Sequence, residues 1–402
     1  MLRDQDIVCV SLPTWDGRYM KAVVHVMRQL ARTNNVLFVD YPFTAKDMAM
    51  TWAGRQDAPV RRMLGVEPRL RRVPVGTDRW VHVLSPPPVL PINGLPDGPV
   101  YDGLLRVNGA IVGHAIRQAM RSLDMSSPIV INAFNPFVGL PLAGALNESL
   151  LVYYCYDEIK AAPWNSRHGA RLEQAFLKKA DVVITTSEGL HLSRKASHPH
   201  CYLVKNGVDF DLFHQAYTPH PSIDEAPQRR TCIGYLGSLD DRLDYDLIEA
   251  LCSSAPDLDF HFVGRIVTPG VQERLGRYPN VHLLGARPPA ALPGLLRQMD
   301  LGIIPFARTP FTRNIYPLKI NEYLAAGKPV VMTDFAPLDE FSALVRIART
   351  PDAFLTALRQ ELAFDTVDRE QARIAMARSN AWADRVERIG SLLSYHLQGA
   401  AA

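Results

Sequence analysis

A lysine and a glutamate three residues apart, Lys319 and Glu322, have the spacing in this sequence that most directly suggests chemistry. Pro317 before them suits the first turn of a helix, and Gly327 after them suits its end. Side chains three apart share one helix face. A lysine near a helix N-terminus favours phosphate, and a carboxylate one turn later can accept hydrogen bonds from a ribose diol. We therefore predict half of a site for a ribose-bearing diphosphate, with an exposed ion pair of no special role as the alternative.

The segment that carries this pair belongs to a regular alternation of short apolar runs and stretches of helical length. Runs that are continuously apolar and rich in Val and Ile are typical of strands buried on both faces of a parallel sheet. The first series is DIVCVSL, NVLFVDYP, WVHVLSP, PIVINAFNP, LLVYYCYDE, DVVITTSEG and CYLVKNGVD. The second series is TCIGYLG, LDFHFVG, NVHLLGA, LGIIPF, PVVMTD and LVRIA. The pattern predicts an α/β protein with two Rossmann-like domains.

A break in the alternation separates the two series. Residues 214–230 are polar, contain three prolines and lack apolar periodicity, so they are predicted to be a linker. The N-terminal domain is then expected over 1–213 and the C-terminal domain over 231–380. Residues 381–402 are expected to contain one more amphipathic helix. Because ligands of open α/β sheets bind at the carboxyl ends of the strands, two such domains are expected to share a cleft there.

The sequence EYLAAGKPVV, which contains Glu322, resembles the second-domain signature of GT-B glycosyltransferases, in particular the family 4 retaining enzymes. The resemblance implies two Rossmann-like domains facing across a cleft, a nucleotide-sugar donor on the C-terminal domain, and a last helix that packs back on the N-terminal domain. It also implies that Glu322 holds the ribose of the donor. Asn314 stands where these enzymes carry the first glutamate of an E-x7-E pattern, and an asparagine can donate hydrogen bonds there but carries no charge.

Glycine-ended strands of the second series match other donor-binding segments of the same family. YLGSLDDRLDYDLI implies that Gly237 lets the backbone approach the diphosphate and that Arg242 neutralises it. The alternative for Arg242 is an ion pair with one of the acids beside it, which are Asp240, Asp241 and Asp244. FHFVGR and VHLLGAR imply further residues near the nucleotide, which are Gly264, Arg265, Leu284 and Gly285.

Two segments of the predicted N-terminal domain also carry candidates, one for donor binding and one for the acceptor side of the reaction. Residues 16–18 stand where the family has a glycine-bearing loop that closes on the donor, which makes Gly17 a donor-binding candidate. Asp157 follows the apolar run LLVYYC, so its carboxylate is expected at the carboxyl end of a strand. There it could orient an acceptor hydroxyl or stabilise a developing positive charge. The alternative is a carboxylate that caps a helix or lies on the rim.

The stretch 46–80 is interpreted as irregular and is rich in arginine, with apolar residues between the arginines. One hypothesis is a peripheral contact with an anionic membrane, in which apolar side chains enter the interface and arginines meet lipid phosphates. This would suit a lipid-linked acceptor. The alternative is a solvated loop and hairpin.

Composition limits the classes of protein that remain. The chain has 402 residues, 47% of them apolar and 21% charged, with a formal net charge of +3. These values indicate a globular protein and do not favour a nucleic-acid binder. The N-terminal sequence does not resemble a signal peptide, and five scattered cysteines suit buried reduced thiols. A cytoplasmic protein is expected, with peripheral attachment to the inner face of the cell membrane as a further hypothesis.

The resulting functional hypothesis is a glycosyltransferase of surface polysaccharide or glycolipid biosynthesis that acts with retention. The donor would be a UDP-, GDP- or dTDP-sugar, the acceptor a glycan or lipid-linked glycan, and no metal or cofactor is indicated. Asp157, Arg242 and Lys319 are the candidate catalytic residues. Two alternatives remain: a catalytically silent nucleotide-sugar-binding protein, and a nucleotide-sugar epimerase of the same fold.

Overall fold

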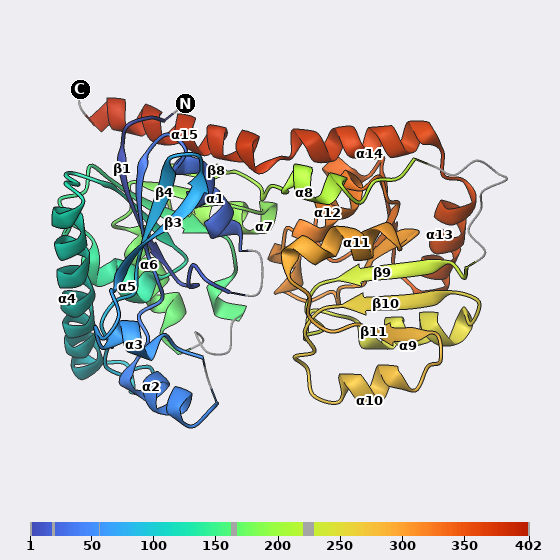
Figure 1. Cartoon of the computed structure of the whole chain (residues 1–402), viewed down its shortest axis with the longest axis horizontal. Helices are drawn as coiled ribbons and strands as arrows, with labels where there is room; N and C mark the ends of the chain where they lie inside the picture. Colours follow the sequence, from blue (N-terminus) through green and yellow to red (C-terminus); the bar gives the residue numbers. More distant parts are fainter. Residues whose placement is uncertain (1, 18–20, 56, 162–166, 220–228, 401–402) are drawn as a thin grey trace. The chain divides into compact units, whose positions relative to one another are not determined.

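The computed structural model describes residues 2–17, 21–55, 57–161, 167–219 and 229–400, and the chain divides into two compact units (Figure 1). The first unit comprises Met1–Lys205 and Val386–Ala402, and the second comprises Asn206–Arg385. The division at Lys205 precedes the predicted linker 214–230, of which residues 220–228 lie outside the described residues.

The first unit is built on an eight-stranded sheet with the order β3-β4-β2-β1-β5-β6-β7-β8. All neighbouring strands are parallel except β3 and β4. The strands are β1 Asp6–Ser11, β2 Asn35–Val39, β3 Leu70–Gly76, β4 Arg79–Leu84, β5 Ile129–Ala133, β6 Leu150–Cys155, β7 Val182–Thr185 and β8 Cys201–Leu203. Each of the seven apolar runs of the first series thus forms a strand.

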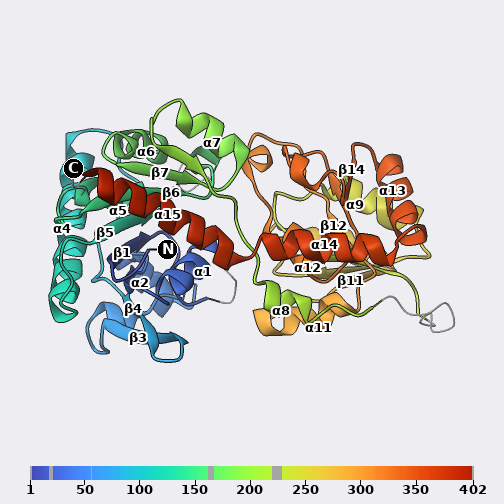
Figure 2. The same ribbon diagram turned by 90° about the horizontal axis from the view of Figure 1, so that it is seen from above.

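Helices cover the faces of this sheet because both faces of its central strands are apolar (Figure 2). The long helix α4 packs Val112 and Ile116 against strand residues such as Val8 and Leu37. The α-helices of this unit are α1 Ala22–Leu30, α2 Ala45–Trp52, α3 Val60–Met63, α4 Pro99–Ser122, α5 Pro136–Leu142, α6 Gly169–Leu177, α7 Glu188–Lys195 and most of α15 Trp382–Ala400.

The interpretation of residues 46–80 as irregular is wrong. Helices α2 and α3, strand β3 and the start of β4 lie in this stretch, and α2 begins with a capping box in which Thr44 and Asp47 each bind the other's backbone N–H. A small cluster of Met48, Ala58 and Met63 holds the two helices together. Two arginines and a proline interrupt the apolar residues of β3, so no regular period-two apolar pattern indicated a strand there.

The second unit is built on a six-stranded parallel sheet with the order β11-β10-β9-β12-β13-β14. Its strands are β9 Cys232–Leu236, β10 Asp259–Val263, β11 Val281–Leu283, β12 Leu301–Ile304, β13 Val330–Thr333 and β14 Val345–Ala348. Its other helices are α8 Phe210–His214, α9 Tyr245–Ser254, α10 Val271–Gly276, α11 Leu292–Arg297, α12 Leu318–Ala325, α13 Pro351–Ala363 and α14 Val367–Ser379. All six apolar runs of the second series form strands, which confirms the α/β prediction of two Rossmann-like sheets.

Candidate functional site

The loops that follow β9, β10 and β11 meet at one edge of the second sheet, because the strands are parallel and adjacent. Gly237 follows β9 and Gly264 follows β10. A Cβ atom at position 264 would lie 1.8 Å from the carbonyl oxygen of Gly237, so only glycine fits there. The backbone of Gly237 has a φ of +146°, a conformation that side chains rarely allow. The two glycines therefore let these loops pack directly on each other.

Helix α12 is fixed against the same edge by buried side chains. It begins after Pro317 and its residues Ile320 and Leu324 are fully buried. The hydroxyl of Tyr323 accepts a hydrogen bond of 2.8 Å from the backbone N–H of Leu236, the last residue of β9. The N-terminal turn of α12 is thereby held beside the Gly237 loop, and the helix ends before Gly327, which has a φ of +71°.

Lys319 lies in the first turn of α12 with its side chain among aromatic rings and glycine backbone. It is 9% exposed, and its Nζ atom lies 5.1 Å from the ring centre of Tyr235 and 4.8 Å from that of Phe306. A Cβ atom at Gly237 would approach Nζ to 3.3 Å. Burial lowers the pKa of Lys319, and the positive charge of Arg242 lowers it further. A cation held this close to a glycine loop is poised to gain from an incoming anion.

Glu322 is partly buried one turn after Lys319. Burial raises the pKa of its carboxyl group, and the charge of Lys319 opposes that shift. Because Lys319 is buried, the pair does not match the alternative of an exposed ion pair on a helix surface.

Arg242 is held by a carboxylate and an aromatic ring. Its Nε and Nη2 atoms donate to the two carboxylate oxygens of Asp240 at 2.8 and 2.6 Å, and its guanidinium carbon lies 5.6 Å from the ring centre of Phe306. Arg242 therefore forms the ion pair with a neighbouring acid that the sequence analysis gave as its alternative role. Both Arg242 and Lys319 contact Phe306, so two positive charges converge on one ring. The sequence analysis did not name Phe306 and Tyr235 as site residues. The only signal for them in the sequence is that each lies near the end of a predicted strand.

The remaining donor-side candidates lie in the segments that follow β10, β11 and β12. The carbonyl of Arg265 accepts from the N–H of Leu239 at 2.8 Å, and the N–H of Leu284 donates to Phe262 at 2.9 Å. Gly285, which has a φ of +69°, is exposed. The side-chain amide of Asn314, in the short helix Thr312–Asn314, donates to the carbonyl of Pro310 at 3.3 Å.

In the first unit, the Gly17 loop is tied to the β3 strand. Arg71 of β3 donates to the carboxylate of Asp16 at 2.6 Å, and Arg62 lies 3.7 Å from it. A Cβ atom at Gly17 would lie 2.7 Å from Nζ of Lys21, which donates to the carbonyl of Asp16 at 2.6 Å. Because Lys21 Nζ is the far end of a flexible side chain, this contact alone does not require glycine; the φ of +158° at Gly17, which side chains rarely adopt, favours it. Arg18 of this loop lies outside the described residues.

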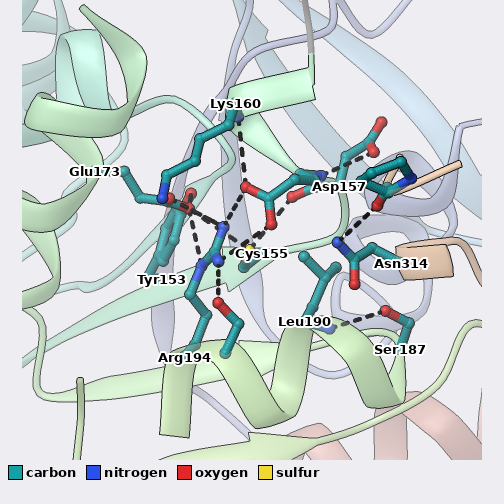
Figure 3. Close-up of polar contacts among 12 residues, drawn as sticks. Tyr153, Cys155, Asp157, Lys160, Glu173, Ser187, Leu190, Arg194 and Asn314 are labelled. Carbon is teal, nitrogen blue, oxygen red and sulfur yellow. Dashed lines mark hydrogen bonds and ion pairs between the residues drawn. The ribbon is translucent and has the colours of Figure 1, made fainter. Parts of the chain in front are cut away.

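Asp157 follows β6, and a buried ion-pair network lies beneath its loop (Figure 3). Arg194 of α7 binds Glu158 at 3.0 Å and Glu173 of α6 at 3.0 Å. Tyr153 donates to Glu173 at 2.8 Å. Burial raises the pKa of Glu173, while the charge of Arg194 opposes the shift. Glu158 is therefore turned toward Arg194.

The carboxylate of Asp157 accepts the backbone N–H of Glu158 at 2.9 Å, and its carbonyl accepts from the thiol of Cys155 at 3.5 Å. These bonds define the loop that presents Asp157 at the carboxyl end of β6. Sequence reasoning placed Asp157 there but missed Arg194 and Glu173, which lie far along the chain in α7 and α6.

The described residues hold no group of three or more His, Cys, Asp or Glu side chains arranged for a metal ion. Within the same described ranges, no helix is long and apolar enough to cross a lipid bilayer.

Part of the chain is similar to known proteins in sequence. Residues 230–363 match the family described as glycosyl transferases group 1. TuaH of Bacillus subtilis (strain 168), assigned to teichuronic acid biosynthesis as a glycosyltransferase, is 32% identical over 216 residues, which cover 49% of this chain and 54% of that protein. The chain therefore spans about half the length of this curated relative.

Solved structures resemble the chain over almost its whole length. Sucrose-phosphate synthase from Thermosynechococcus elongatus has a TM-score of 0.68 at 16% identity and covers 99% of this chain and 100% of its own. Anabaena HepE, solved with UDP and glucose, has a TM-score of 0.62 at 14% identity and covers 97% and 99%. These neighbours have the GT-B architecture. The chain thus has the GT-B fold of two Rossmann-like units, and its residues 230–363 match the family described as glycosyl transferases group 1.

Proposed function

We propose that this protein transfers a sugar, with retention of anomeric configuration, from a nucleotide-diphosphate sugar to a glycan or lipid-linked acceptor. The observation that carries the proposal is the convergence of Lys319, Arg242 and Glu322 beside the Gly237 loop of a glycosyl transferases group 1 domain. A buried cation, a second cation and a carboxylate one helical turn away complement a diphosphate joined to a ribose.

In this mechanism the second unit holds the donor. The ammonium of Lys319 and the guanidinium of Arg242 neutralise the charge that grows on the leaving diphosphate, and Glu322 accepts hydrogen bonds from the ribose hydroxyls. Gly237 and Gly264 allow the backbone to approach the phosphates, and the segment around Arg265, Leu284 and Gly285 borders the nucleotide. Asn314 donates a hydrogen bond to the donor sugar or its phosphate.

The first unit supplies the acceptor side. Asp157, at the carboxyl end of β6, orients the acceptor hydroxyl, and the leaving phosphate takes the acceptor proton. The donor is a UDP-, GDP- or dTDP-sugar. UDP-sugars come first because HepE was solved with UDP and glucose, and a similar structure described as trehalose-6-phosphate from E. coli was solved with UDP-2-fluoro glucose. The assignment of TuaH to teichuronic acid biosynthesis supports a surface polysaccharide as the product.

The proposal is tested by ligand-induced stabilisation followed by turnover. One of UDP, GDP and dTDP should raise the Tm of the second unit's transition, because a ligand that binds only the folded state stabilises it by mass action. The matching sugar nucleotide should then be consumed only when an acceptor is added. Binding without turnover over a panel of acceptors would favour the silent binding protein, and conversion of the donor without acceptor would favour the epimerase.

We also propose that helices α2 and α3 contact an anionic membrane. Trp52, Leu64 and Val66 are 71%, 49% and 63% exposed, and the exposed arginines Arg55 and Arg61 lie among them. The exposed residues around α2 and α3 lie at one end of the β3–β4 hairpin, and Arg79 and Trp80 lie toward its other end. Leu70 pairs with Leu84 beside the helices, and Gly76 pairs with Arg79 at the other end. The contact surface is therefore smaller than the stretch 46–80.

Charge reversal in this group is expected to weaken binding to anionic vesicles. In sedimentation with phosphatidylserine-containing liposomes, R55E/R61E should bind at least about tenfold more weakly than the parent, since each basic residue near such a surface contributes roughly 1 kcal/mol. The control R79E/R121E changes the same number of exposed arginines away from α2 and α3 and should pellet like the parent. An equal loss of vesicle binding in both variants, or no loss in either, would contradict the proposed membrane contact of α2 and α3.

A further inference from the structure

Helix α12 carries a buried asparagine between the two residues proposed to hold the donor. Asn321 is fully buried, and it lies two residues after Lys319 and directly before Glu322. Since residues two apart on a helix do not share a face, Asn321 lies on a different face of α12 from Lys319. A side-chain amide taken out of water is costly unless its hydrogen bonds are made within the protein. Asn321 therefore needs partners from other parts of the second unit.

Two side chains bind this amide, and a third joins them to each other. The Nδ2 atom of Asn321 donates to the hydroxyl of Tyr316 at 3.0 Å, and its Oδ1 atom accepts from the side-chain amide of Asn380 at 2.8 Å. Arg385 donates to Oδ1 of Asn380 and to the hydroxyl of Tyr316. The hydrogen bonds thus form a closed circuit, called here the Asn321 network, whose members are Tyr316, Asn321, Asn380 and Arg385.

The Asn321 network fixes the start of α12. Tyr316 directly precedes Pro317, the N-cap residue, whose side chain cannot accept the hydrogen bond with which Ser, Thr, Asp or Asn caps a helix. The position of the first turn, which contains Lys319, therefore depends on where Tyr316 is held. Asn321 ties the next turn, which contains Glu322, to the same hydroxyl.

The other side of the network is anchored where the chain passes between the two units. Asn380 follows α14, and its carbonyl accepts the backbone N–H of Val208 at 3.0 Å. The N–H of Trp382 donates to the carbonyl of Val208 at 3.1 Å. A Cβ atom at Gly207 would lie 2.9 Å from backbone atoms of Trp382, so a side chain would clash there. Both segments that connect the second unit to the first thus pass through this anchor.

A buried polar network of this kind contributes more to a unique placement than to stability. The Nε atom of Arg385 is buried and has no hydrogen-bond partner among the described residues, so the network leaves one donor unsatisfied. An apolar contact between α12 and α14 would avoid that cost. Hydrogen bonds, unlike apolar contacts, weaken steeply with distance and angle, and they therefore hold α12 in one position.

We infer that Asn321 and Asn380 are positioning residues of the donor site, which hold α12 where Lys319 and Glu322 meet the diphosphate and the ribose. The inference rests on the proposed function and adds residues that act through this pair without touching the donor. When the network is broken, apolar burial still keeps α12 on the sheet, but its polar face takes several positions. A misplacement of about 1 Å costs up to about 100-fold in rate.

The test begins with kcat/KM for the donor, measured on folded protein below the Tm of each variant. Asn321→Leu replaces the amide by an apolar group of similar size, and Tyr316→Phe removes only the hydroxyl. Either change should lower kcat/KM by about tenfold or more. The matched control is Asn280→Leu, which removes another buried asparagine of the same unit, one that donates to three backbone carbonyls just before β11. It should lower the Tm but keep kcat/KM within about twofold of the parent.

A double-mutant cycle separates positioning from general destabilisation. Lys319→Ala should lower kcat by about 100-fold or more in the parent, but by about tenfold or less in the Asn321→Leu and Tyr316→Phe backgrounds, where the lysine is already out of place. In the Asn280→Leu background the full loss should remain. The full loss in the Asn321→Leu and Tyr316→Phe backgrounds, or kcat/KM equal to the parent in both single variants, would overturn the inference.

The same cycle measured as Kd for UDP separates this inference from the proposed function. A parent that binds UDP but transfers no sugar would refute the transferase, and non-additive losses in Kd would still assign the positioning role. Transfer by the parent with additive losses would overturn the positioning role and leave the transferase standing. A parent that binds none of UDP, GDP and dTDP would refute both.

Discussion

Lys319→Ala is expected to lower kcat by about 100-fold or more, because a preorganised cation that meets charge developed in the transition state contributes roughly that much. Its Nζ atom lies within 5.1 Å of the Tyr235 ring centre and beside the Gly237 loop, where bulk water competes little for the leaving diphosphate. Steady-state kinetics with saturating donor and acceptor measures the effect. KM for the donor should change less than kcat, since the interaction strengthens as the bond to the leaving group breaks.

The matched control is Lys328→Ala, which removes the next lysine of the same unit, just beyond the end of α12. Burial also lowers the pKa of Lys328, so the two changes are comparable in charge and environment. The control should keep kcat within a few-fold of the parent, as expected for a cation outside the site. Turnover by Lys319→Ala close to that of the parent would remove Lys319 from the chemistry.

Arg194→Met is expected to destabilise the first unit by about 3–5 kcal/mol, because it leaves a buried carboxylate without its cation. Glu173 is 1% exposed and depends on Arg194 for two contacts, Nε–Oε1 at 3.3 Å and Nη2–Oε2 at 3.0 Å. The loss should appear as a lower Tm at neutral pH. It should be smaller in mildly acidic buffer, where protonation of Glu173 removes the unpaired charge, since burial already raises the pKa of this group.

Two further variants give this prediction its controls. R194M/E173Q should recover much of the loss, because the replacement amide carries no charge to leave unpaired. Arg171→Met breaks ion pairs with Asp97 and Asp102 in which all three side chains are more than 40% exposed, so it should cost less than about 1 kcal/mol. A Tm of Arg194→Met equal to that of Arg171→Met would contradict the role given to the buried pair.

Much of the fold could be predicted from the sequence because its strands are continuous apolar runs. DVVITT and LGIIPF, for example, have no polar residue at their centres. They form β7 and β12, which are interior strands of the two sheets with parallel neighbours on both sides. Strand β3 could not be predicted in the same way. Its sequence LRRVPVG is only partly buried along its length, because it pairs on one side only, at the edge of the sheet.

The candidate site could be predicted only as far as local spacing reaches. The separation of Lys319 and Glu322 places them on one helix face from sequence alone. The rings around Lys319 belong to Tyr235 and Phe306. These two residues are brought together by the order of strands in the sheet, which local spacing does not predict. The carboxylate of Asp16 is bound by Arg71, which is 55 residues away in the sequence. Contacts of this kind are fixed by tertiary packing, and one sequence carries no local pattern for them.

The path of helix α15 has a consequence for the order in which the protein matures. From Val386 onward the helix belongs to the first unit, where Gly390 lies against Leu2 and His396 binds the hydroxyl of Tyr202 at 3.0 Å. On the ribosome these residues emerge after the whole of 206–385. The unit that is begun first is therefore finished last, and its sheet must wait for a closing helix while the second unit already has its complete chain.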